Sequence, residues 1–140
     1  MSRSGYADDG DDPGLWRGAV RRATTGYRGQ YLLRRLRDAL DAMPVKRLIA
    51  DAIKDETGDV CAFGALDPSA SLYSARDLAE HFGIAMALAA EIVYMNDEAL
   101  HWRSRDETPE ARWIRMRAWV DEQITAESKD ADSGTEATGR

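Results

Sequence analysis

The chain has 140 residues, of which 44% are hydrophobic and 31% are charged, and its formal net charge at pH 7 is -6. This length fits one domain with one hydrophobic core and excludes a second core of similar size. There is no run of roughly 18 apolar residues, as a membrane span requires, and no apolar stretch of a signal peptide near the N-terminus. We therefore expect a cytoplasmic protein with no membrane partner, and the single cysteine agrees with a reducing compartment.

Charge is distributed unevenly along the sequence. Residues 15–48 contain nine Lys and Arg against two Asp, so their net charge is +7, whereas residues 49–110 contain four basic and thirteen acidic residues and carry −9. Either the two parts neutralise each other in the fold, or the basic part forms an anion-binding surface.

Both ends of the chain are polar and have little to bury. We expect a flexible N-terminal tail at residues 1–12, a single domain at 13–125 and a flexible C-terminal tail at 126–140. The domain begins with two predicted helices. The first starts at Pro13 and stops at Gly26, and the second covers residues 28–43, where leucines form an apolar stripe and Pro44 ends the pattern.

Residues 46–66 allow two interpretations. One is a β-hairpin that turns at Gly58. The other is a short helix at 45–54, a turn at Gly58 and a helix that begins near Cys61, and the alanine-rich composition favours it. Small residues such as Gly64 let two backbones, or a backbone and a ligand, approach closely.

Three more helices are expected after this segment. Ser74 is a predicted N-cap of a helix that stops at Gly83, residues 84–95 form a buried central helix, and Thr108 opens the last helix, with Arg112 and Arg115 outside its apolar face. Asn96 and Asp97 stand where the apolar pattern ends. We expect them to terminate the central helix and to fix the following loop through hydrogen bonds to the backbone.

The predicted fold class is therefore mainly α, a single small helical domain of about five helices with a short β-hairpin near 46–66 as the open alternative. The turn of residues 79–83 resembles a helix-turn-helix. Its second helix has no Arg, Lys, Asn or Gln to contact base edges, so we do not expect sequence-specific DNA binding.

Cys61 is the one candidate nucleophile. The chain order of Cys61, His81 and then Asn96 or Asp97 is that of papain-like cysteine hydrolases, but apolar residues flank the cysteine and little chain is available for a substrate cleft. A buried structural cysteine is the favoured interpretation. Two histidines and one cysteine without ligand spacing predict no metal site, and the absence of a phosphate-loop or dinucleotide fingerprint predicts no cofactor.

A second candidate site lies in the basic part of the chain. It combines guanidinium groups with an aromatic ring, the groups that hold phosphates and stack on a base. The residues predicted to form this anion- or partner-binding surface are Arg17, Arg21, Arg22, Tyr27 and Arg28. The alternative is an ordinary solvated basic face.

Several blocks of the sequence carry a resemblance. The runs GDVCAFGAL, FGIAMALAAEIVYMNDE and ETPEARWIRMRAWVDEQI resemble a group of uncharacterised small proteins found mainly in bacteriophages and prophages, over about residues 16–124. A shorter set of blocks also carries a resemblance. A CALGAL-like block, followed by ND and by a T-P-type helix start, resembles a wider bacterial domain of unknown function. The resemblance implies a phage-derived accessory protein in the host cytoplasm and no particular activity.

The predicted function is thus a non-enzymatic accessory protein that binds a host protein or a phosphate-bearing small ligand, such as a nucleotide signal, through the basic surface. The alternatives are a small cysteine hydrolase that uses Cys61 with His81 or His101, and an acidic DNA mimic built on residues 49–110. The sequence leaves a homo-oligomer open.

Overall fold

The computed structural model describes residues 13–70, 74–98 and 107–138, with side chains from 16 to 124 inside these ranges. The described residues form six helices: α1 (Pro13–Thr25), α2 (Tyr27–Ala42), α3 (Ala62–Leu66), α4 (Ala75–Phe82), α5 (Met86–Asp97) and α6 (Pro109–Thr138). The prediction of a small, mainly helical fold is confirmed, with one helix more than expected.

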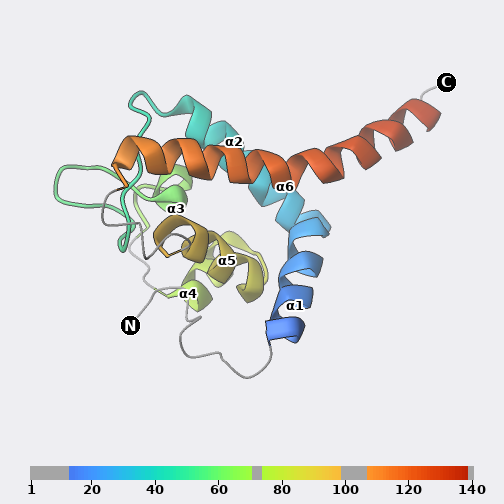
Figure 1. Ribbon diagram of the computed structural model, residues 1–140, viewed down its shortest axis with the longest axis horizontal. Helices are drawn as coiled ribbons and strands as arrows, with labels where there is room; N and C mark the ends of the chain where they lie inside the picture. The colour runs from blue at the N-terminus through green and yellow to red at the C-terminus, as the bar shows by residue number, and fades with distance from the viewer. Residues whose placement is uncertain (1–12, 71–73, 99–106, 139–140) are drawn as a thin grey trace.

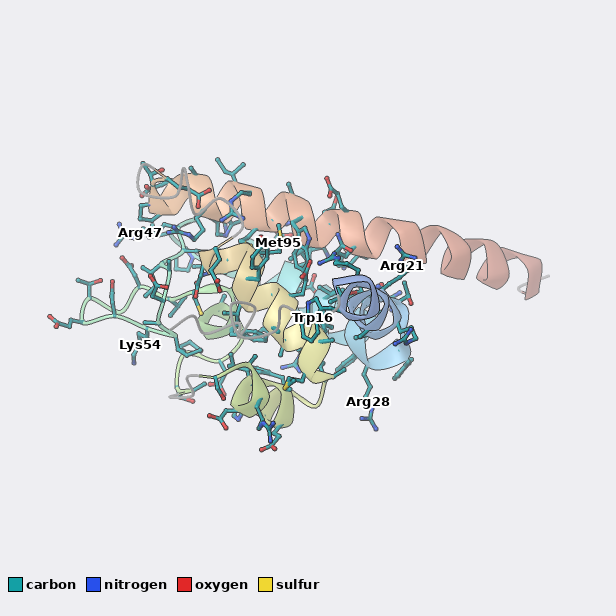
Figure 2. The ribbon with its side chains drawn as sticks, turned by 60° about the horizontal axis from the view of Figure 1, so that its bottom comes forward. Trp16, Arg21, Arg28, Arg47, Lys54 and Met95 are labelled. Carbon is teal, nitrogen blue, oxygen red and sulfur yellow. The ribbon has the colours of Figure 1, made fainter. Side chains whose placement is uncertain are left out.

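The helices pack around α5. In Figure 1, α6 crosses α2, while α5 lies between α6 and α4; the turned view in Figure 2 shows the same order. Helix α1 packs against α5 and α2, and α3 lies between α2 and α5. Among the described helices no single one is long and apolar enough to cross a membrane, and α4 and α5 reach that length only as a pair bent by 119°.

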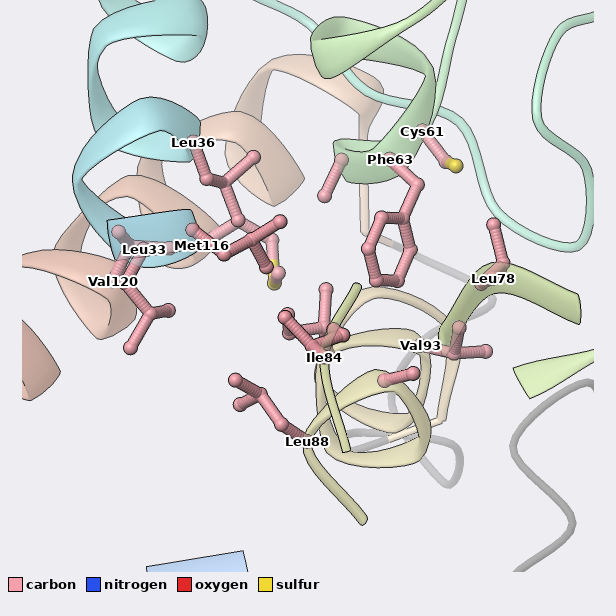
Figure 3. Packing of buried hydrophobic residues seen from close by; sticks show 14 of the residues in the cluster. Leu33, Leu36, Cys61, Phe63, Leu78, Ile84, Leu88, Val93, Met116 and Val120 are labelled. Carbon is pink, nitrogen blue, oxygen red and sulfur yellow. The ribbon is translucent and has the colours of Figure 1, made fainter. Parts of the chain in front are cut away.

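Leucines of α2 and apolar residues of α5 and α6 meet in one core, to which α3 adds Phe63 (Figure 3). The Phe63 ring stacks on Phe82 of α4, with centroids 5.1 Å apart. Residues 87–93 of α5 are all buried, so this helix is the centre of the domain, as its apolar sequence predicts.

Helix α4 begins and ends at the residues that the sequence predicts. The Ser74 hydroxyl accepts a hydrogen bond from the Asp77 N–H at 3.2 Å at the start of α4, and Gly83, with φ of 70°, ends it. The corner between α1 and α2 needs Gly29, because a Cβ there would lie 1.9 Å from the Ala23 carbonyl oxygen.

The segment before α3 combines both sequence interpretations. The expected helix at 45–54 is wrong. That stretch is irregular and ends in a single antiparallel bridge between Lys54 and Val60 around a turn at Gly58, whose φ is 92°. The predicted helix that begins near Cys61 is present, since Cys61 is the N-cap residue of α3.

The predicted boundary at residue 125 is not an end of a helix, because α6 continues to Thr138 and extends away from the other helices (Figure 1). The predicted N-terminal tail, residues 1–12, lies outside the described residues.

Candidate functional site

The five residues predicted to form one basic surface are divided between two sides of α1. Arg17 makes a bidentate ion pair with Glu91 of α5, with Nη1–Oε1 at 3.1 Å and Nη2–Oε2 at 3.3 Å. Arg17 and Arg21 line a polar cavity of about 170 Å³ between α1, α5 and α6. The Glu91 side chain is only 6% exposed, so Arg17 compensates a buried carboxylate. Arg17 and Arg21 therefore line a different cavity from the other three predicted residues.

The other three residues do come together. Arg22, Tyr27 and Arg28 line a depression of about 430 Å³ at the corner between α1 and α2, and Ile84 and Ala85 also contribute to its lining. We call this depression the corner site. Tyr27 is 86% exposed, and Figure 2 shows Arg28 well separated from Arg21.

The basic character continues along α2 beyond the residues that the sequence analysis selected. Tyr31, Arg34 and Arg35 are exposed. The Arg35 guanidinium carbon lies 5.8 Å from the Tyr31 ring centroid, which is the geometry of a cation–π contact. The spacing of four residues between Tyr27 and Tyr31 is a signal that could have identified this extension.

Asn96 and Asp97 form the last turn of α5 and bind the loop that precedes α3. The Asn96 Oδ1 accepts from the Ala62 N–H at 3.1 Å, and its Nδ2 donates to the Ile49 carbonyl at 2.9 Å and to the Asp97 Oδ1 at 2.7 Å. The same Asp97 oxygen accepts from the N–H of Asp51, whose φ is 67°. The two side chains thus hold an earlier loop, whereas we expected them to fix the following one, residues 99–106, which lie outside the described part.

Two arginines of α6 complete this buried polar network. Arg112 donates from Nε to the Asn96 carbonyl at 3.0 Å and from Nη1 to the Leu48 carbonyl at 3.3 Å. Arg115 donates to both carboxylate oxygens of Glu107, at 2.7 and 3.0 Å. That hydrogen bond lowers the pKa of Glu107 below its ordinary value, against the opposing effect of burial.

The prediction that Arg112 and Arg115 lie outside the packed face of the last helix is wrong. Arg112 is buried and the Arg115 side chain is only 20% exposed. Within the described part, every buried side-chain nitrogen or oxygen of this network has a partner. The arrangement therefore holds the fold together and offers no buried polar atom to a ligand.

Cys61 is enclosed in the core beside Phe63, with 1% of its surface exposed (Figure 3). His81 lies on the surface of α4, where its Nε2 is 2.9 Å from the Asp67 carboxylate. A substrate carbonyl cannot reach the thiol without opening the core, and His101 lies outside the described residues. The geometry gives no support to a cysteine hydrolase.

The close packing at Gly64 accounts for a small residue in the run GDVCAFGAL. A Cβ at this position would lie 2.3 Å from the Ile53 carbonyl oxygen and 2.6 Å from the Val60 Cβ, so α3 packs directly on the preceding chain. Gly64 also lines a mostly apolar groove of about 430 Å³ together with Val45 and with the Arg47–Asp59 ion pair.

Several acidic residues of the segment 49–110 are neutralised or buried in the described part of the structure. Glu91 and Glu107 are paired with arginines, Asp97 is buried in the polar network, and Asp59 pairs with Arg47 at 2.9 Å. Among the residues described, no group of three or more His, Cys, Asp or Glu side chains is placed to hold a metal ion.

No family model matches the chain, and neither the curated proteins nor the solved structures include one that matches it.

Proposed function

We propose that the protein is a non-enzymatic binding protein whose corner site receives a phosphate-bearing ligand. The observation that carries this proposal is that Arg22 and Arg28 line one depression with the exposed ring of Tyr27. A guanidinium group donates two parallel hydrogen bonds to a phosphate, and a tyrosine ring stacks on a base, so the three side chains suit a nucleotide.

The charges of the two arginines are available to a ligand. In the described part of the structure, neither Arg22 nor Arg28 forms an ion pair. Arg17, by contrast, is neutralised by Glu91. The phage or prophage setting, and a host factor as the source of the ligand, remain part of the proposal on the strength of the sequence resemblance alone.

A titration with GTP, inorganic tripolyphosphate and guanosine tests the proposal. GTP and tripolyphosphate should bind, and guanosine, which lacks phosphate, should bind far more weakly. Affinity for the two phosphate compounds should fall between about 50 and about 200 mM salt, because salt screens the attraction between the arginines and the phosphates.

The double variant Arg22→Glu/Arg28→Glu should weaken binding by about tenfold or more, equivalent to about 1.4 kcal/mol. Its matched control is Lys54→Glu/Arg76→Glu, which changes the net charge equally at exposed positions of the turn before α3 and of α4. Both variants should melt within a few degrees of the wild type, since exposed charges contribute about 0–1 kcal/mol to stability. Equal losses in the two double variants, or no binding of either phosphate compound to the wild type, would overturn the proposal.

A further inference from the structure

We propose that the corner site continues along the exposed face of α2 as a binding surface for single-stranded nucleic acid, with Tyr27 and Tyr31 stacking on successive bases. This inference rests on the proposed function, since the phosphate site at Arg22 and Arg28 is its first part. The additional part is formed by Tyr31, Arg34 and Arg35, and we call it the α2 platform.

The two tyrosines have the geometry of a stacking surface. Four residues separate them along α2, so they lie on one face of the helix with a rise of about 6 Å between them. Their exposed fractions are 86% for Tyr27 and 57% for Tyr31, so neither ring is used in the core. The Arg35 guanidinium over the Tyr31 ring adds a second flat, cationic surface on which a base can stack.

The charges along α2 favour a polyanion on this half of the helix. Arg28, Arg34 and Arg35 are exposed and, within the described residues, form no ion pair. The acidic residues of α2 lie towards its C-terminal end and are compensated there. Asp38 pairs with Arg37 at 3.3 Å, and Asp41 pairs with Arg117 of α6 at 2.7 Å.

An unpaired strand fits this surface better than a duplex. Bases in a duplex are stacked on one another, so surface tyrosines cannot reach their faces, whereas an unpaired strand offers base faces and phosphates together. The helical pair α4–α5 also cannot bind in the major groove of a duplex, because residues 87–93 of α5 are buried. An acidic peptide would satisfy the arginines but would supply no base to stack on the exposed rings of Tyr27 and Tyr31.

The test uses the full chain and a fluorescein-labelled oligothymidylate of about 12 nucleotides, with a hairpin duplex and an oligoglutamate peptide as competitors. Tyr31→Ala should weaken oligothymidylate binding about tenfold while leaving GTP binding at the corner site unchanged. Tyr31→Phe, which keeps the ring, should restore the affinity. The matched control is Ile114→Ala, which removes another exposed large side chain, on α6.

Each outcome decides between the two proposals. If GTP binding depends on Arg22 and Arg28 but oligothymidylate binding is unaffected by Tyr31→Ala, the α2 platform is wrong and the proposed function stands. Duplex or oligoglutamate that competes as well as unlabelled oligothymidylate would also overturn the platform. If GTP, tripolyphosphate and oligothymidylate all fail to bind, both proposals fall together.

Discussion

Replacing Asn96 with alanine should destabilise the protein strongly. The side chain is 1% exposed and makes three hydrogen bonds, of which two go to distant backbone groups: the Ala62 N–H at the start of α3 and the Ile49 carbonyl of the preceding loop. Leaving a buried donor or acceptor without a partner costs about 1–3 kcal/mol. Two such groups give an expected loss of about 2–6 kcal/mol, a large part of the ~5–15 kcal/mol by which domains are stable.

Urea unfolding followed by tryptophan fluorescence measures this loss as a shift of the midpoint at constant slope. A loss below about 0.5 kcal/mol, the usual range of surface substitutions, would show that Asn96 does not hold the loop.

The nearly isosteric change Asn96→Asp sharpens the experiment. It keeps the acceptor for the Ala62 N–H but places an oxygen where the Nδ2 group stands 2.7 Å from the Asp97 carboxylate. At neutral pH this variant should be at least as unstable as Asn96→Ala, because two carboxylates repel each other at this distance. Acidification returns a proton to the pair, so the folded variant binds more protons than the unfolded one and should gain stability relative to Asn96→Ala as the pH falls. A difference between the two variants that does not change with pH would refute the reasoning.

Three further substitutions test other parts of the fold. Glu107→Gln should lower stability at neutral pH, and the difference from the wild type should shrink as the pH falls below 4.5. The reason is that the hydrogen bond from Arg115 depresses the pKa of Glu107, so the stabilisation by the carboxylate is lost when it is protonated. A difference that stays constant in urea unfolding down to about pH 3 would contradict this. Cys61, which is 1% exposed, should react with a thiol reagent far more slowly in the native protein than in urea. The substitution Cys61→Ser should lower the free energy of unfolding by about 1–2 kcal/mol without abolishing GTP binding. A folded variant that cannot bind GTP would refute a structural role for the cysteine. Gly64→Ala should lower the free energy of unfolding by about 1–3 kcal/mol, because the new Cβ would lie 2.3 Å from a backbone oxygen. Its control, Gly18→Ala in α1, should be neutral or stabilising, because the nearest atom there belongs to an arginine side chain at 3.4 Å. Equal shifts of the melting temperature in the two variants would contradict the packing argument.

The sequence predicted those features that depend on neighbours along the chain. Ser74, Gly83 and Thr108 each act through a hydrogen bond or a dihedral angle within one helical turn, and the structure places the corresponding helix ends beside them. The apolar run of α5 predicts burial because no face of that helix is polar enough to face water.

Residues 45–54 show why local reasoning fails elsewhere. Their composition favours a helix, but three of the backbone groups in this stretch are bound by side chains from α5 and α6. Asn96 binds the Ile49 carbonyl, Asp97 the Asp51 N–H and Arg112 the Leu48 carbonyl. These partners lie 46–64 residues away in sequence, beyond the reach of any local propensity.

The divided basic surface has a similar explanation, part of which could be read from the helix itself. Residues four apart turn by about 40° around a helix and residues five apart by about 140°, so Arg17 and Arg21 share a face that Arg22 does not. The remaining part depends on tertiary structure. Glu91 is placed opposite Arg17 by the packing of α5 on α1, and nothing in the spacing of the arginines anticipates that neighbour.

The net charge of -6 therefore says little about the surface that a ligand meets. Burying Glu91 and Glu107 is costly without a partner, and each is paired with an arginine, so the charges of Arg17 and Arg115 are spent on buried carboxylates. Where α2 carries acidic residues, Arg37 and Arg117 neutralise them at 3.3 and 2.7 Å. Around the first turns of α2 the described structure supplies no such compensation, and fields from exposed charges fade over about 8–10 Å in physiological salt. A ligand at the corner site would therefore be subject mainly to the field of the nearby arginines and much less to that of the acidic remainder of the chain, as the proposed phosphate site requires.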